Sequence, residues 1–221
     1  MLFPQPKNAQ YGQQQYRTKE DYTDCELLDF YHRVKTGNGD ITVVTAPLLE
    51  REEYRLTVDA RGVTMEASCE EGFFRAATSV WQLIRRGKGS LPYARIEDKP
   101  ELKRRGYMLD VSRGRIPKME TLKVLVDLLA GLKYNELQLY FEGMCFVYSQ
   151  FPQYTADFSC LTSADMEELD QYCSERFIAL VPNQNSLGHM TSWLEQEEFR
   201  HLGLGDGGEV PNTLNPLLEE S

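Results

Sequence analysis

Residues 104–118 read RRGYMLDVSRGRIPK, and this stretch decides the fold. The apolar run from Tyr107 to Val111 has the residue types that favour strands, and it carries Asp110 inside it. The run stops at residues 112–117, which read SRGRIP and contain two arginines. Charged groups at the end of an apolar strand need solvent or one another, because burying an unpaired charge is costly. The stretch therefore predicts a buried strand that ends in a polar edge.

Helices and strands alternate along the chain after this strand. Pro117 suits the first turn of a helix. Residues 136–141 (ELQLYF) predict a second strand, a helix capped by Thr162 and Ser163 follows, and residues 178–182 (IALVP) predict a third strand. The first helix places apolar residues at three-and-four spacing, namely Leu122, Leu125, Val126, Leu129 and Leu132. Alternation of this kind implies parallel strands with right-handed crossovers.

Two parallel architectures fit this rhythm, an open doubly wound sheet and a (β/α)₈ barrel. A dinucleotide-binding sheet normally carries G-x-G-x-x-G after its first strand, whereas this chain has SRGRIPK there. The barrel is therefore the prediction. Because a complete barrel needs roughly 250 residues, the stretch from Gly106 to Ser221 is too short to close one. We expect a partial (β/α)₈ TIM barrel of about three βα units.

The residues before the barrel predict a small α+β domain. Gly62 suits the turn of a hairpin, because it tolerates positive φ. The expected elements are a loop or single edge strand in residues 1–20, strands at 41–46, 54–58 and 63–67, and a helix at 72–86. We assign residues 21–98 to this domain and residues 99–221 to a truncated N-terminal part of the catalytic barrel.

Composition excludes several classes of protein. The net charge of −10 and the isoelectric point near 4.9 oppose nucleic-acid binding, which needs clustered lysines and arginines. No run approaches the ~18 apolar residues of a membrane helix, and the N-terminus lacks the pattern of a signal peptide. The five scattered cysteines form no C-x-x-C pair, which favours reduced thiols over disulfides or a zinc site. We expect a cytoplasmic protein without nucleic-acid or membrane partners.

Polar side chains follow each of the three predicted strands. Barrel enzymes place their catalytic and binding residues at the C-terminal ends of strands, so these residues predict one shared site. They are Asp110 and Arg113 after the first strand, Glu142 after the second, and Asn183, Asn185 and His189 after the third. Simpler interpretations stay open: a structural ion pair between Asp110 and Arg113, a solvated Glu142, and a surface histidine at 189.

Four stretches of this sequence resemble glycoside hydrolase family twenty, the β-N-acetylhexosaminidases. Residues 105–140 (RGYMLDVSRGRIPKMETLKVLVDLLAGLKYNELQLY) are similar to the start of the family's barrel, whose first strand reads approximately RGxxLDxSR. Residues 72–84 and 91–106 look like the end of the family's small α+β domain. Residues 167–190, which end in Gly188-His189, look like its helix and third strand.

The resemblance implies roles for individual residues. Arg113 matches the arginine that binds hydroxyls of the terminal sugar, a task suited to a planar fork of donors. His189 matches the histidine of the hydrogen-bond network around the catalytic acid, and Glu142 stands near its usual aspartate partner. Asp110, Asn183 and Asn185 would support them, and Tyr140, Phe141 and Phe146 would either stack on the sugar or pack together. The resemblance implies no metal and no cofactor.

The catalytic pair of the family is not found in this sequence. Family members use an Asp-Glu pair after the fourth strand, in a mechanism in which the substrate's 2-acetamido group attacks the anomeric carbon. The nearest acids here, Asp206 and Glu209, lie in a glycine-rich loop after an expected helix at 192–201. We therefore expect no catalytic residue in this chain and place the pair after Ser221. An open barrel edge would favour self-association.

These observations predict a hydrolase that removes terminal N-acetylhexosamine from glycans, of which this chain would be an incomplete and inactive portion. A non-catalytic sugar-binding or regulatory fragment is the alternative. A different barrel hydrolase is a third interpretation, because fold alone does not give function.

Overall fold

The computed structural model describes residues 2–155, 159–205 and 209–220. Two compact units divide the chain. One comprises Met1–Arg105, Val126–Asn135 and Glu175–Ile178, and the other comprises Gly106–Leu125, Glu136–Ser174 and Ala179–Ser221. The elements in chain order are β1 (Asn8–Arg17), α1 (Leu27–Val34), β2 (Ile41–Thr45), β3 (Tyr54–Asp59), β4 (Gly62–Ala67), α2 (Glu70–Gly87), β5 (Ser90–Asp98), β6 (Gly106–Asp110), α3 (Met119–Gly131), β7 (Glu136–Phe141), η1 (Pro152–Tyr154), α4 (Ser163–Ser174), β8 (Ala179–Gln184), α5 (Thr191–Leu194) and η2 (Arg200–Leu202).

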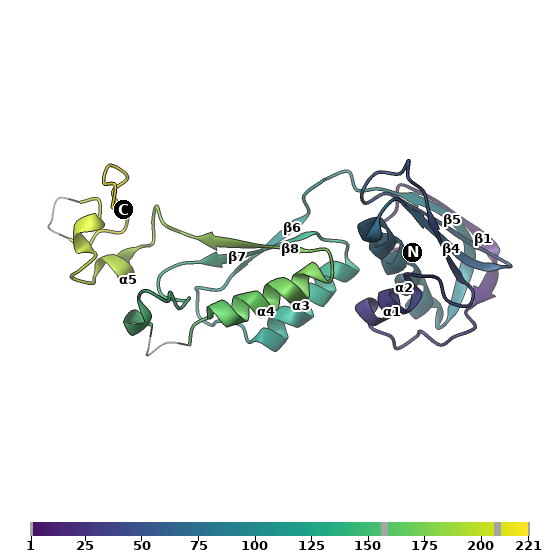
Figure 1. The fold of residues 1–221 in the computed structure, drawn as a ribbon, viewed down its shortest axis with the longest axis horizontal. Coiled ribbons are helices and arrows are strands. Elements are labelled where there is room, and N and C mark those ends of the chain that lie inside the picture. Colours follow the sequence, from purple (N-terminus) through teal and green to yellow (C-terminus); the bar gives the residue numbers. More distant parts are fainter. Residues whose placement is uncertain (1, 156–158, 206–208, 221) are drawn as a thin grey trace. The chain divides into compact units, whose positions relative to one another are not determined.

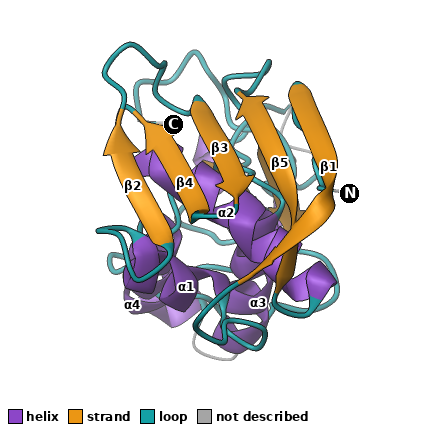
Figure 2. Cartoon of the chain, turned by 90° about the vertical axis from the view of Figure 1, so that its right-hand side faces the viewer, coloured by secondary structure: helices purple, strands orange, loops and turns teal. Residues whose placement is uncertain are grey.

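The first unit contains a five-stranded sheet of order β1-β5-β3-β4-β2, with α1 and α2 on one face (Figure 2). β3 and β4 form the predicted hairpin, paired antiparallel from Tyr54 opposite Ala67 to Asp59 opposite Gly62. Gly62 has φ +131°, and a Cβ there would lie 2.1 Å from the Asp40 carbonyl oxygen. Only glycine therefore fits this turn.

Helix α2 supplies the side of the core that faces the sheet. It contains the predicted residues 72–86 and carries acids in its first turn and arginines in its last, which suits the helix dipole. Its apolar face is buried, with Ala76, Val80 and Ile84 fully inside. The left-handed Lys88 (φ 50°) and Gly89 (φ 86°) follow the helix and end it.

Two elements of this unit were missing from the sequence prediction. α1 buries Leu27, Phe30, Tyr31 and Val34 at helical spacing, but its eight residues are too short to stand out as a periodic pattern. β5 was not predicted as a strand, and it contains Pro92 and three charged residues. Its charges alternate with buried Leu91, Ala94 and Ile96, so the strand pattern was present. The edge-strand interpretation of residues 1–20 is confirmed by β1.

The second unit contains the predicted parallel sheet, of order β6-β7-β8. α4 and the first half of α3 lie on one face of it (Figure 1). β7 alternates between buried and half-buried residues, and its buried members are Leu137, Leu139 and Phe141. A small mixed-sheet domain is thus followed by three parallel β/α units, as expected for the beginning of a (β/α)₈ barrel.

Two predictions for this unit are wrong. The first strand is not buried: Tyr107 is 41% and Met108 is 55% exposed, because β6 is an edge strand, and only Val111 beyond its end is fully buried. The expected helix at 192–201 is replaced by the short elements α5 and η2. The acidic residues between these elements, Glu195, Glu197 and Glu198, supply no apolar face for a continuous helix. Glu209 is exposed, and Asp206 lies outside the described residues.

Within the described ranges, no helix is both long and apolar enough to cross a bilayer.

A buried ion network joins the segment Val126–Asn135 to the rest of the first unit. Lys133 follows α3 in the left-handed region (φ 61°) and its side chain is only 7% exposed. Its Nζ donates to Tyr54 Oη at 2.7 Å and to Asp98 Oδ2 at 3.2 Å. Tyr54 Oη also contacts Ser79 Oγ at 2.7 Å. Burial lowers the pKa of Lys133 to about 8, although the Asp98 carboxylate works in the other direction.

This lowered pKa predicts a stability that rises with pH. The unfolded chain keeps the Lys133 proton up to about pH 10.4, whereas the folded chain releases it near pH 8. Between these values the unfolded state binds more protons, so the free energy of unfolding increases with pH. Burial raises the pKa of Tyr54 well above 10, so its opposing effect begins only above pH 10.

We expect wild-type chain to gain about 1 to 2 kcal/mol in the free energy of unfolding, relative to Lys133→Met, between about pH 7.5 and 9.5. At neutral pH the variant should be the less stable of the two, because the half-buried Asp98 carboxylate loses its only ammonium partner among the described contacts and keeps only neutral donors. Urea titrations at each pH measure the difference. Lys103→Met, at an exposed lysine, is the control and should show no pH trend. A flat difference for Lys133→Met would contradict the titration.

Candidate functional site

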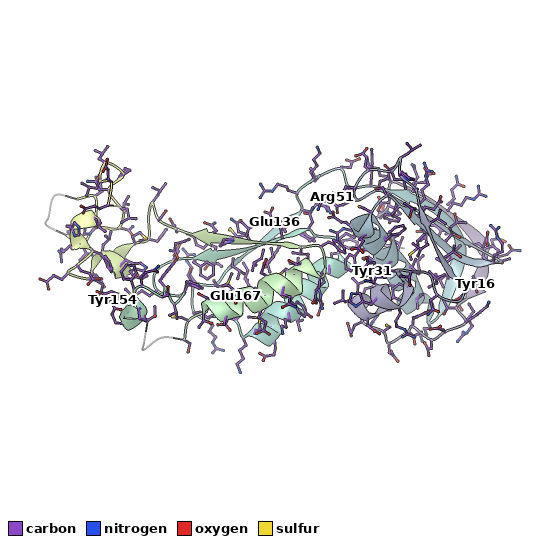
Figure 3. The ribbon with its side chains drawn as sticks, viewed as in Figure 1. Tyr16, Tyr31, Arg51, Glu136, Tyr154 and Glu167 are labelled. Carbon is purple, nitrogen blue, oxygen red and sulfur yellow. The ribbon has the colours of Figure 1, made fainter. Side chains whose placement is uncertain are left out.

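The polar residues predicted from the sequence lie at the carboxyl ends of three strands. Asp110 is the last residue of β6, Glu142 follows β7 directly, and Asn185 follows β8 directly. The strands are parallel and in register, with Asp110 opposite Tyr140 and Tyr140 opposite Asn183. Parallel pairing brings these ends to one edge of the sheet. In Figure 3 the labelled Glu136, the first residue of β7, marks the opposite end of that strand.

Arg113 connects the end of β6 to the end of β7. Its Nη1 pairs with Asp110 Oδ2, and its Nη2 donates to Glu142 Oε1 at 2.6 Å. The guanidinium also lies over the ring of Tyr140, with its carbon 5.8 Å from the ring centroid. Asp110 is itself fixed by Ser112, whose backbone N–H and Oγ donate to Oδ1 at 2.9 and 2.6 Å. One guanidinium therefore bridges two carboxylates from neighbouring strands.

Glu142 is the centre of this arrangement. Its side chain is only 13% exposed, and Oε1 accepts from Tyr140 Oη at 2.5 Å as well as from Arg113. His189 Nε2 lies 3.7 Å from the same oxygen. Asn185 Nδ2 donates to Tyr140 Oη at 2.7 Å, which ties the end of β8 into the network. We call Asp110, Arg113, Tyr140, Glu142, Asn185 and His189 the strand-end cluster.

The charges of the cluster shift the pKa values of three members. Burial raises the pKa of Asp110, but the hydrogen bonds from Ser112 and Arg113 outweigh it, so the net pKa is lowered. Hydrogen bonds to Asp110 and Glu142 raise the pKa of Arg113. The hydrogen bond to Glu142 raises the pKa of the Tyr140 hydroxyl. Asp110 and Arg113 therefore stay charged at neutral pH.

The cluster offers both donors and acceptors to a polar ligand. The Arg113 side chain is 58% exposed, so its fork of N–H groups is accessible although two of them are paired. Carboxylate oxygens, a phenol, an amide and an imidazole stand around it. Such a set suits a ligand with several hydroxyl groups, which donate and accept at once. Within the described ranges, no three side chains of His, Cys, Asp or Glu are grouped so as to hold a metal ion.

The structure brings together five of the six residues predicted from the sequence: Asp110, Arg113, Glu142, Asn185 and His189. Asn183 lies on β8 in register with Tyr140, and the hydrogen bond to the Tyr140 hydroxyl comes from Asn185 instead. Tyr140 was missed as a polar member of the cluster. Its position two residues before Glu142 could have indicated it, because alternate residues of a strand share one face.

Phe141 ends β7 with its side chain on the opposite face from Tyr140, and it forms a packed aromatic contact with Phe146 from the following loop. Their ring centroids are 5.9 Å apart, and Phe141 is only 4% exposed. They line an apolar cavity of about 510 Å³ together with residues of α4 and β8. Of the two interpretations of these rings, packing is the one that their position supports.

Comparisons with known proteins cover most of the chain. Residues 23–99 match the profile of "Glycosyl hydrolase family 20, domain 2", and residues 103–209 match that of "Glycosyl hydrolase family 20, catalytic domain". A β-hexosaminidase of Vibrio furnissii is 30% identical over 219 residues, which cover 82% of this chain and 35% of the relative. A β-hexosaminidase of Akkermansia muciniphila is 26% identical, over 85% of this chain and 38% of the relative.

Solved structures share this fold. The exo-β-N-acetylglucosaminidase of Vibrio harveyi, in complex with N-acetylglucosamine, superimposes with a TM-score of 0.81 at 20% identity, over 99% of this chain and 42% of that one. A Streptomyces plicatus β-hexosaminidase in complex with its product gives 0.80 at 22% identity, over 99% of this chain and 54% of that one. The chain thus spans little more than a third of the first two relatives by sequence and about half of these structures.

The lowered pKa of Asp110 predicts an acid-dependent contribution to stability. A carboxyl group with a lowered folded pKa stabilises the fold above its unfolded value of about 3.9, and this contribution is lost as the pH falls through the folded pKa. We therefore expect Asp110→Asn to be less stable than wild-type chain at pH 6. The two should converge as the pH approaches 3.

Thermal unfolding monitored by circular dichroism from pH 6 to 3 measures this convergence. Asp24→Asn, at a carboxyl group outside the cluster, is the control and should follow wild-type chain throughout. A stability difference for Asp110→Asn that stays constant over the whole range would contradict the assignment.

Proposed function

The chain belongs to glycosyl hydrolase family 20, and on this basis we propose that it is part of an exo-acting β-N-acetylhexosaminidase that releases terminal N-acetylglucosamine or N-acetylgalactosamine from glycans. It contributes the small domain and the first three β/α units of the catalytic domain, and it spans only part of its relatives. Hydrolysis in this proposal is retaining and substrate-assisted, with the 2-acetamido carbonyl of the sugar as nucleophile.

One observation carries the proposal: Arg113 is held between two carboxylates at the carboxyl ends of β6 and β7. Paired carboxylates orient the guanidinium before a ligand arrives, so less conformational entropy is lost when it binds. In the proposal its exposed N–H groups donate to hydroxyls of the terminal sugar. His189 and Glu142 belong to the hydrogen-bond network that would orient the catalytic acid.

The acid and the residue that orients the acetamido group are not assigned to this chain. The family places an Asp-Glu pair after the fourth strand, and the sequence contains no adjacent Asp-Glu dipeptide. We propose that this chain binds the sugar but does not hydrolyse it. The missing dipeptide also favours a second candidate, in which the chain is not part of a hydrolase but a non-catalytic sugar-binding or regulatory fragment.

Titration with N-acetylglucosamine tests the binding half of the proposal. We expect weak, saturable shifts in the NMR spectrum of wild-type chain, and a loss of affinity of about tenfold or more in Arg113→Ala, because hydrogen bonds from a charged group contribute about 1.5 to 3 kcal/mol. Arg115→Ala removes an exposed arginine two residues away and should bind within about twofold of wild type. Equal affinity in all three proteins would show that Arg113 does not bind the sugar.

Turnover is tested with a nitrophenyl β-N-acetylglucosaminide. The purified chain should release no nitrophenol above the rate of the buffer, because no residue assigned here protonates the leaving oxygen. A complete family 20 enzyme under the same conditions is the positive control. Release of nitrophenol that scales with the concentration of the chain would show that other acids, among them Asp206 and Glu209, replace the pair.

A further inference from the structure

We propose that Trp193 is a positioning residue that joins the loop after β7 to the loop after β8, and so sets the distance between Glu142 and His189. The proposal rests on the proposed function, because it assigns a role to Trp193 in the same sugar site. The local sequence does not indicate a functional role for Trp193, because a tryptophan beside an apolar residue usually belongs to the core.

A hydrogen bond from Trp193 connects the two loops. Trp193 is 8% exposed, and its indole Nε1 donates to the carbonyl oxygen of Gly143 at 2.9 Å. A buried indole N–H needs an acceptor, so this bond is expected to persist in the folded chain. Gly143 is bonded directly to Glu142, the centre of the strand-end cluster. The indole therefore holds the backbone next to Glu142.

Four aromatic rings fix the orientation of the indole. They surround Trp193 with ring centroids between 5.7 and 6.2 Å from its own, at interplanar angles of 64° to 70°. The rings belong to Tyr148, Phe151, Tyr154 and Phe199. Three come from the loop after β7, where Figure 3 labels Tyr154 near α5, and one follows α5. Edge-to-face contacts on several sides leave the indole little freedom, so its N–H has a defined direction.

Gly143 suits this contact because it carries no side chain. Its φ is +56°, and a Cβ at this position would lie 2.9 Å from Ser192 Oγ. Ser192 is the neighbour of Trp193 in sequence, and its Oγ is buried. The backbone at Gly143 therefore lies close to the side chain of Ser192 as well as to the indole of Trp193. A side chain at position 143 would push the two loops apart.

The backbone conformation of His189 depends on the same contact between the loops after β7 and β8. Its φ of +55° is unusual for a residue other than glycine, and such a conformation persists only where the surroundings impose it. The following turn does so, because Trp193 N donates to the Met190 carbonyl at 3.0 Å and Met190 N donates to the Asn212 carbonyl at 3.1 Å. The 3.7 Å between His189 Nε2 and Glu142 Oε1 exceeds a hydrogen bond, so no direct bond between the two side chains sets this distance, and the position of the backbone contributes to it.

The chain offers a matched control for the indole N–H. Trp81 in the first unit also donates its Nε1 to a backbone carbonyl, that of Cys25, at 2.8 Å. Trp193→Phe and Trp81→Phe each keep an aromatic ring and remove one such hydrogen bond. Both variants should unfold at a lower temperature. Only Trp193→Phe should change the NMR signals of the Arg113 Nε–H and the His189 ring, which are assigned by their disappearance in Arg113→Ala and His189→Gln.

A second pair of variants tests the backbone contact. Gly143→Ala introduces a Cβ against Ser192, whereas Gly39→Ala places a Cβ at nearly the same φ (+55°) with no atom within 4 Å. Both replace a left-handed glycine and should be destabilised by similar backbone strain. Only Gly143→Ala should move the Arg113 and His189 signals. If Trp193→Phe does not fold, this pair of glycine variants still tests the positioning role.

Affinity for N-acetylglucosamine completes the experiment. We expect Trp193→Phe and Gly143→Ala to bind about five- to tenfold more weakly than wild type, with both control variants unchanged. Unchanged Arg113 and His189 signals in Trp193→Phe and Gly143→Ala would overturn the positioning role. If wild-type chain shows no binding at all, the proposed function fails, while the Arg113 and His189 signals still decide whether Trp193 positions these groups.

Discussion

The in-register parallel pairing of β6, β7 and β8 is the constraint on which the site depends. Because Asp110 stands opposite Tyr140 and Tyr140 stands opposite Asn183, the residues that follow these strands emerge at one edge of the sheet. A shift of one residue in either pairing would turn these side chains to the helix-covered face. Arg113 can bridge Asp110 and Glu142 only in this register.

Strand register brings side chains together, but it does not fix the loops that carry them. In this protein a second layer of contacts does so. Ser112 orients Asp110, Asn185 orients the Tyr140 hydroxyl, and Trp193 holds the backbone beside Glu142. The left-handed conformations of Gly143 and His189 lie on either side of this joint. A site of this kind is rigid because hydrogen bonds fix both its side chains and its backbone.

Membership of glycosyl hydrolase family 20 gives this geometry a chemical context. The small mixed-sheet domain and the three parallel β/α units match solved hexosaminidases in fold, although identity to them is low. A fold can persist through many substitutions as long as the volume of the core and the pattern of apolar and polar residues are kept. The strand-end cluster is the part of the chain in which particular residues, rather than volume and polarity, decide what can be bound.

Much of this protein follows from the sequence by itself. Strand and helix periodicity predicted α2, α4, β7 and the hairpin, and polar residues after three apolar runs predicted Asp110, Arg113, Glu142, Asn185 and His189 as neighbours, because parallel strands end at one edge. Only the tertiary structure decided the exposure of β6, the central position of Tyr140 and the joint at Trp193. These depend on contacts between residues far apart in the chain, such as the 2.9 Å bond from Trp193 to Gly143, and local sequence patterns carry no signal for which distant partner a side chain will meet.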